Sequence, residues 1–288
     1  MTTDNSIPLI IAGPTLRHCD EQHFTLWFVS KKPLQSLRLR LIGTEFDREL
    51  GSDELHCVTL GKHAFQYLIR VSQVDLLPKY TQLQYQVYND NHVLFDDIDA
   101  LSYPQRQNGE FIIKPHVDKL LHGSCRNAHH HSGDALVAAD SQLAQCTDIS
   151  QRPALLMMSG DQVYVDDIAG PMLYAIGQVI SLLGLEHEQF VDAPLQDSSQ
   201  ISYQPAAMYK RHLDLLPKTQ YKAKTAIARW YVNHPIFTSS LAENHLVSLN
   251  ELIALYLLYW SPELWELIEI PKQVAGLSQA NNQRWQRE

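Results

Sequence analysis

The sequence has no apolar run close to the length of a membrane-spanning helix. The longest candidate lies between Leu252 and Trp260 and is interrupted by two tyrosines, whereas a span needs about 20 apolar residues. The first residues contain no basic segment followed by an apolar one, so no secretion signal is visible. We therefore expect a cytoplasmic protein without a membrane partner.

Cysteine is scarce and scattered. The four cysteines are Cys19, Cys57, Cys125 and Cys146, and no two of them form a Cys-x-x-Cys pair. This spacing argues against a disulfide framework and against a zinc ribbon, and it fits a reducing compartment.

The chain also lacks an excess of positive charge. It has 23 Lys and Arg against 32 Asp and Glu, a formal net charge of -9 and a pI near 5.8, which argues against a nucleic-acid partner. A small phosphate ester can still bind an acidic protein where a bound metal supplies the positive charge. There is no Walker loop, dinucleotide-binding glycine motif, nucleophile elbow or zinc-protease motif, so serine-based nucleophilic catalysis has no support.

The first 115 or so residues contain repeated short strand patterns separated by turns. In residues 37–41 leucine and arginine alternate, which predicts leucines facing a core and arginines facing water. Similar runs occupy residues 24–29, 56–60, 65–71 and 82–88. Strands at this spacing, without a helical period, predict that residues 1–115 form an antiparallel β-sandwich of immunoglobulin or fibronectin type.

The pattern changes after residue 115. Residues 119–123 and 154–158 read as short buried strands, and residues 134–146 between them read as a helix. A strand–helix–strand unit predicts two parallel strands with a right-handed crossover. Residues 116–288 are therefore expected to form a second domain of α/β type.

Further helices are expected in the second half of the chain. They cover residues 168–184, part of residues 205–235, the segment to Trp260 after the capping-box spacing of Ser248 and Glu251, and a segment beginning at Pro262. Residues 186–204 read as a polar loop, and Lys218, Lys222 and Lys224 as a solvated helix face.

The two predicted parallel strands bring chemistry-bearing residues to one edge. Parallel strands end on the same edge of a sheet, so Cys125 and Asp161, which follow the two strands, should lie near one another. In open α/β sheets ligands bind at this carboxyl edge. The sequence thus predicts a ligand site there.

Asp161 and Cys125 each have two interpretations. Asp161 is either a capping residue in a strand-to-helix turn or a metal ligand. Tyr164 and the Asp166-Asp167 pair favour the metal, since crowded carboxylates need a compensating cation. Cys125 is either a small buried apolar residue or a thiolate ligand to a metal such as iron or zinc.

Arg126 and the histidine run that follows it also allow more than one interpretation. Arg126 could hold a phosphate through a bidentate contact or could pair with a neighbouring carboxylate. Consecutive side chains point in different directions, so we expect His129-His130-His131 to form a solvated loop with at most one functional histidine.

Two motifs stand at the ends of the predicted parallel strands. The first is Gly123-Ser124-Cys125-Arg126-Asn127, and the second is Ser159-Gly160-Asp161-Gln162-Val163-Tyr164. Together they resemble the motifs of the PhoD-like (alkaline phosphatase D) metallophosphoesterases, a family that cleaves phosphate mono- and diesters.

The resemblance implies an αββα metallophosphoesterase domain and a metal centre. By this resemblance Cys125 is a thiolate ligand to Fe³⁺, Asp161 bridges the iron to Ca²⁺ and acts in catalysis, and Tyr164 is a phenolate ligand. Mn²⁺ or Zn²⁺ are alternative metals. Arg126 is a weaker catalytic candidate, as a phosphate contact.

The sequence departs from the family pattern after these motifs. The later Asp-Asp-His-Glu type of run and its completing histidines do not occur before Glu288. We therefore expect the chain to match the N-terminal portion of a longer enzyme, with weak or no activity by itself and with self-association through the exposed face of the shortened domain. The alternative is a non-catalytic binding or assembly module that keeps the fold.

Overall fold

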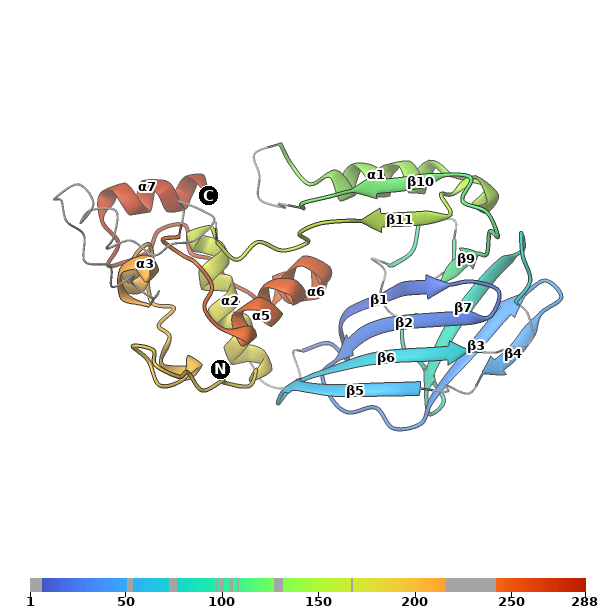
Figure 1. Ribbon diagram of the computed structural model, residues 1–288, viewed down its shortest axis with the longest axis horizontal. Coiled ribbons are helices and arrows are strands. Elements are labelled where there is room, and N and C mark those ends of the chain that lie inside the picture. The colour runs from blue at the N-terminus through green and yellow to red at the C-terminus, as the bar shows by residue number, and fades with distance from the viewer. Residues whose placement is uncertain are drawn as a thin grey trace. The chain divides into compact units, whose positions relative to one another are not determined.

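The protein combines antiparallel sheets with helices (Figure 1). The computed structural model describes residues 7–50, 54–72, 77–96, 98, 101–103, 106–107, 109–126, 132–166, 168–215 and 242–288. The chain divides into two compact units. Unit 1 contains Met1–Gln162 and Trp260–Glu263, and unit 2 contains Val163–Tyr259 and Leu264–Glu288.

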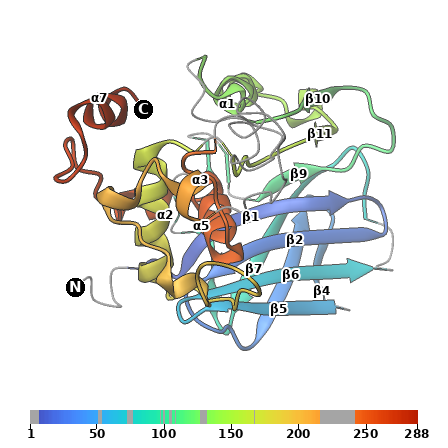
Figure 2. The ribbon, with the colours of Figure 1, turned by 60° about the vertical axis from the view of Figure 1, so that its left-hand side comes forward.

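The first sheet of unit 1 has four antiparallel strands in the order β1-β2-β6-β5 (Figure 2). They are β1 (Ile10–Cys19), β2 (His23–Ser30), β6 (Ala64–Ser72) and β5 (Glu54–Gly61). Strand β2 is rich in aromatic and branched residues, which suit a half-buried pleated surface. It pairs with β6 without interruption from His23↔Ser72 to Ser30↔Phe65.

The second sheet of unit 1 follows the order β4-β3-β7-β8, and a further strand, β9, pairs with β7. The strands are β3 (Leu37–Gly43), β4 (Asp47–Leu50), β7 (Gln82–Asn89), β8 (His92–Val93) and β9 (Glu110–Ile112). The alternation predicted for β3 is confirmed. Leu39 and Leu41 are buried, while Arg40 donates to Asp47 at 2.8 and 2.6 Å on the exposed face.

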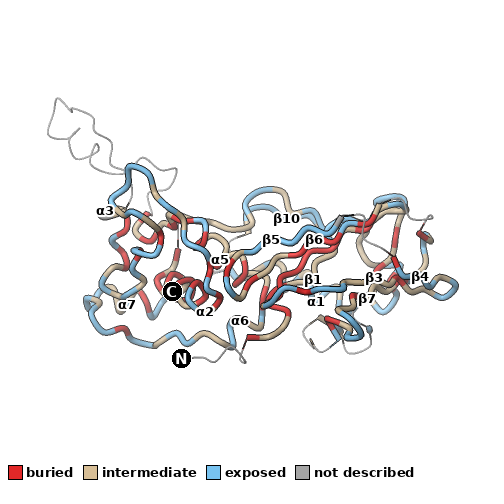
Figure 3. The backbone as a smooth tube through the Cα atoms, turned by 90° about the horizontal axis from the view of Figure 1, so that it is seen from below, coloured by how far each residue is buried: buried red, intermediate tan, exposed pale blue. Residues whose placement is uncertain are grey.

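One hydrophobic core contains residues of both antiparallel sheets. Phe28 of β2 stacks on Tyr67 of β6 at 5.2 Å between ring centroids and meets Phe95 edge-on at 5.4 Å. Leu41 of β3 and Val87 of β7 belong to the same core, which appears as red stretches in Figure 3. Because each fully buried large apolar side chain stabilises the fold by roughly 1.5–3 kcal/mol, this shared core holds the two sheets together.

The predicted strand–helix–strand unit is confirmed within unit 1. Strand β10 (Leu120–Gly123) and strand β11 (Leu155–Met158) pair in parallel, from Leu120↔Leu155 to Gly123↔Met158. Helix α1 (Ala135–Gln145) lies between them in the chain, and the Asp134 carboxylate caps it by accepting a hydrogen bond from the Leu136 amide at 3.0 Å.

The prediction that these two strands are buried was wrong. Leu120, Leu155, Leu156 and Met157 are each 46–47% exposed. Within the described residues the sheet has two strands, so each strand has one neighbour and no strand covers the other edge. Parallel strands elsewhere are usually covered on both faces. Helix α1 contains no buried residue, so it does not provide that cover.

Unit 2 is helical in the residues that the structure describes. Its longest elements are α2 (Gly170–Leu183) and α5 (Leu249–Trp260), whose last residue falls in unit 1. Gly184 ends α2 in the left-handed conformation with φ 57°, as helix C-termini favour. The capping box is confirmed in part, because the Glu251 carboxylate accepts from the Val247 and Ser248 amides at 2.8 and 3.2 Å.

Shorter helices complete the described elements. They are η3 (Ile149–Gln151), η4 (Ser198–Gln200), η5 (Pro205–Ala207), α3 (Arg211–Asp214), α6 (Pro262–Glu266) and α7 (Gln279–Arg287). The helix expected at Pro262 is confirmed, whereas α7 was not predicted. Lys218, Lys222 and Lys224 lie outside the described residues.

Two further observations concern the predicted domain boundary and the absence of a membrane-spanning helix among the described residues. The compact units divide after Gln162, which does not test a domain boundary at residue 115, so that boundary stays a prediction. Among the helices of the described segments, none is long and apolar enough to cross a membrane.

Candidate functional site

The two motif loops at the carboxyl ends of β10 and β11 lie side by side in unit 1. The Arg126 amide donates to the Asp161 carbonyl at 2.7 Å, and the Ser159 amide donates to the Gly123 carbonyl at 3.0 Å. The expected proximity of Cys125 and Asp161 is therefore confirmed for their backbones, since parallel strands place both loops at one edge.

Backbone conformation explains why a glycine stands at position 160. Gly160 has φ +105°, and a Cβ built there would lie 2.4 Å from the Ser124 hydroxyl and 3.2 Å from the Cys125 sulfur. Only glycine fits this close approach with a positive φ. Cys125 itself has φ 56°, a sparsely populated conformation for a residue with a side chain.

Two polar contacts at this edge were not predicted from the sequence. The Ser124 hydroxyl lies 3.3 Å from the Cys125 sulfur. Across the two strands, His122 Nε2 lies 2.7 Å from the Ser159 hydroxyl. Cys125 and Asp161 are both exposed, so a ligand could reach them. No sequence signal marked His122 and Ser159 as partners, because their contact depends on the register of the strands.

Arg126 is held by an acidic neighbour. Its Nη2 and Nε donate to one carboxylate oxygen of Asp134 at 2.7 and 3.1 Å, and each side chain is 16% exposed. Burial would raise the pKa of Asp134, but hydrogen bonds from Arg126 and the Leu136 amide lower it below its usual value. The structure thus has the carboxylate pairing, one of the two interpretations left open, and the phosphate contact stays a prediction.

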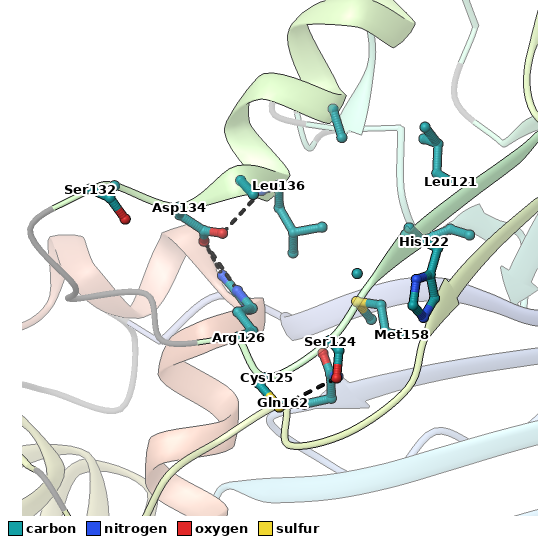
Figure 4. Close-up of a pocket in the computed structure, with 15 residues that line it drawn as sticks. Leu121, His122, Ser124, Cys125, Arg126, Ser132, Asp134, Leu136, Met158 and Gln162 are labelled. Carbon is teal, nitrogen blue, oxygen red and sulfur yellow. Dashed lines mark hydrogen bonds and ion pairs between the residues drawn. The ribbon is translucent and has the colours of Figure 1, made fainter.

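A cavity of about 380 Å³ adjoins these loops (Figure 4). Strand residues Leu121, Leu156 and Met158 line one side, and helix residues Leu136 and Ala139 line another. Cys125, Arg126 and Gln162 contribute polar groups. Small-molecule sites are typically apolar hollows of about 300–1,000 Å³ with a few polar groups, so the cavity has a suitable size and lining.

The other predicted ligands fall outside unit 1 or outside the described residues. Tyr164 and Asp166 belong to unit 2, and their role as ligands stays a prediction. Asp167 and His129–His131 lie outside the described residues. Of the three predicted metal ligands, the structure therefore brings together Cys125 and Asp161, and their roles as ligands stay predictions.

A different group of residues has the arrangement of a metal site. Within the described part of the chain, the one set of three His, Cys, Asp or Glu ligand atoms lying within 4.8 Å of one another is His18, Asp20 and His23. It includes neither Cys125 nor Asp161. Sequence analysis missed it, although the spacing His-x-Asp-x-x-His was available as a signal.

Comparison of the chain with protein-family models gives no match, and neither does comparison with curated proteins. The site is therefore interpreted from its own geometry and from the motifs.

Proposed function

We propose that the chain carries part of a metal-dependent phosphatase or phosphodiesterase site that hydrolyses small phosphate esters. Cys125 and Asp161 are metal ligands in this proposal, with Tyr164 as the third. The observation that carries the proposal is the hydrogen bond from the Arg126 amide to the Asp161 carbonyl. It joins a loop with a sulfur donor to a loop with a carboxylate at the edge where α/β sheets bind ligands.

The donor set decides which metals suit the site. Cys125, Asp161 and Tyr164 would hold Fe³⁺ through a thiolate, a carboxylate and a phenolate, and Ca²⁺ would take oxygen ligands, with Mn²⁺ or Zn²⁺ as alternatives. When bound, such a metal would polarise the phosphoryl group and neutralise its developing charge. The groups of this chain hold and orient the ester, and the apolar walls at Leu121 and Met158 receive the alcohol part.

Arg126 is proposed as the phosphate contact. Its guanidinium lies against the cavity and is already fixed by Asp134, so a bound phosphate would compete with or share this ion pair. Bidentate contacts between arginine and a carboxylate have the same geometry as those with a phosphate, which makes the exchange chemically reasonable.

The finer fold assignment belongs to the same proposal. Two antiparallel sheets with a common core support an immunoglobulin- or fibronectin-like sandwich for residues 1–115. The parallel pair β10–β11 with α1 supports part of an αββα metallophosphoesterase domain within residues 116–288. In the same proposal the protein is cytoplasmic, its partner is a small phosphate ester, and it has no nucleic-acid partner.

We expect the activity of this chain to be low. Among the described residues no group of three His, Cys, Asp or Glu ligands includes Cys125, and a site with few ligands binds metal weakly. The proposed enzyme therefore needs added metal for any measurable turnover.

Hydrolysis of aryl phosphate mono- and diesters by the metal-supplemented chain tests the proposal. Slow turnover that depends on added metal is expected, and Cys125→Ser and Asp161→Asn should each abolish it. Cys57→Ser is the matched control, because Cys57 is another exposed free thiol and its loss should leave the rate unchanged. Turnover that both site variants retain would contradict the assignment.

A second candidate, a non-catalytic binding or assembly module, is favoured by one observation. Leu120, Leu155 and Met157 are about half exposed on a parallel strand pair, whereas such strands are normally covered. Association of this face with a second copy of the chain would cover it.

A further inference from the structure

A cluster of three metal-binding residue types closes the hairpin between β1 and β2, well apart in sequence from the Cys125 loop. His18 is near the end of β1, Asp20 is in the turn, and His23 begins β2. The strands pair up to Cys19↔Phe24, so the turn is short and brings the two histidines to the same end of the hairpin. Their rings lie 5.9 Å apart between centroids.

The turn fixes the Asp20 carboxylate. One oxygen, Oδ1, accepts hydrogen bonds from the backbone amides of Gln22 and His23, each at 2.8 Å. The Asp20 amide donates to the His23 carbonyl at 3.0 Å. The next residue, Glu21, is tied down as well, because its carbonyl accepts from the Leu77 amide at 2.8 Å. The carboxylate is thus positioned before any ligand arrives.

The second oxygen of Asp20 lies between the two imidazoles. Oδ2 is 3.1 Å from His18 Nε2 and 3.1 Å from His23 Nδ1, which also lies 2.9 Å from Oδ1. For a tetrahedral ion with bonds of about 2.0–2.1 Å to nitrogen and oxygen, neighbouring ligand atoms lie roughly 3.3 Å apart. Both Oδ2 separations are close to this value, and all three ligand atoms lie within 4.8 Å of one another, so a small rotation of the side chains would place them on one ion.

We propose that His18, Asp20 and His23 form a binding site for a divalent transition metal of the zinc class, which clips β1 to β2. Two imidazoles and one carboxylate suit Zn²⁺, whereas Ca²⁺ and Mg²⁺ prefer sets of oxygen ligands. The side chains of His18, Asp20 and His23 are 61%, 47% and 37% exposed, so the ion enters from solvent and the fourth position is open to water. The alternative is a set of hydrogen bonds in which both rings donate to Asp20.

The metal proposal predicts binding that depends on both histidines and not on Cys125. The full-length chain carrying Cys125→Ser is freed of metal and titrated with Zn²⁺ by calorimetry and with Co²⁺ by visible absorption. One equivalent should bind, with the Co²⁺ spectrum of nitrogen and oxygen ligands and no thiolate charge-transfer band. Using Cys125→Ser as the background separates this site from the proposed phosphatase centre.

Single variants complete the test. In the Cys125→Ser background, His18→Gln and His23→Gln should each weaken Zn²⁺ binding by at least about tenfold, since even changes beyond the first ligands cost that much. His116→Gln, at another exposed histidine, should bind as the background does. Circular dichroism in EDTA confirms that the variants fold. The proposal is overturned if the background takes up no zinc, or if either site variant binds as tightly as the background.

Discussion

At the scale of single residues, the site depends on a glycine that accepts a left-handed backbone. Gly160 lets the loop after β11 approach the Ser124 hydroxyl and the Cys125 sulfur. It also precedes Asp161, whose carbonyl accepts the hydrogen bond that joins the two loops. Parallel pairing places Cys125 and Asp161 at one edge, and Gly160 allows their two loops to pack closely there.

We predict that Gly160→Ala destabilises unit 1 and separates the two loops. The positive φ alone costs about 1–3 kcal/mol for a residue with a side chain, and the Cβ would lie 2.4 Å from the Ser124 hydroxyl. Urea unfolding measures the loss. Gly133→Ala is the matched control, because Gly133 has φ +82° and no atom within 4 Å of an added Cβ.

The comparison separates backbone strain from steric contact. Gly133→Ala should show the strain alone, and Gly160→Ala should cost more by the contact with Ser124. Equal losses in the two variants would contradict the close packing of the loops around Gly160.

At the scale of elements, the parallel pair β10–β11 leaves much of its apolar surface exposed. Side chains alternate along a strand, and Leu121, Gly123, Leu156 and Met158 line the cavity shared with α1. On the opposite face of the strand pair, Leu120, Leu155 and Met157 are each about half exposed. Leu156, on the side of α1, is equally exposed, but the face with Leu120, Leu155 and Met157 has no described helix lining a cavity with it.

We predict that this face drives association of the chain with itself at high concentration. In sedimentation velocity the wild type should show a concentration-dependent increase in weight-average sedimentation coefficient, and Leu155→Gln should reduce it. Val137→Gln is the matched control, since Val137 on α1 is 65% exposed but lies on a different element. A monomer at every concentration, or an equal effect of both variants, would contradict this role.

At the scale of the whole molecule, sequence reasoning recovers the elements whose patterns are strong. The Leu–Arg alternation of β3 and the apolar stretch of α2 predict the observed strand and helix. Strand β1 was missed because Gly13-Pro14 interrupts its pattern and its register shifts along β2. Helix α7 was missed because it is polar, with Trp285 as its buried residue.

Burial and side-chain clustering were harder to predict than the elements themselves. The run Leu155–Met158 reads as buried because apolar strands usually are, but burial depends on neighbouring strands that the run does not encode. The sequence does place Cys125 and Asp161 at one edge, because parallel pairing requires it. The spacing of His18, Asp20 and His23 was available in the sequence, but their approach to one another depends on the turn geometry at Asp20.

The most direct test of the central claim, that Cys125 and Asp161 share a metal, is X-ray absorption at the iron edge of the Fe³⁺-loaded chain. The account predicts a sulfur scatterer among the ligands of iron, present in the wild type and in Cys57→Ser and lost in Cys125→Ser. It also predicts fewer oxygen ligands in Asp161→Asn. An iron environment of nitrogen and oxygen alone, unchanged by Cys125→Ser, would contradict the claim.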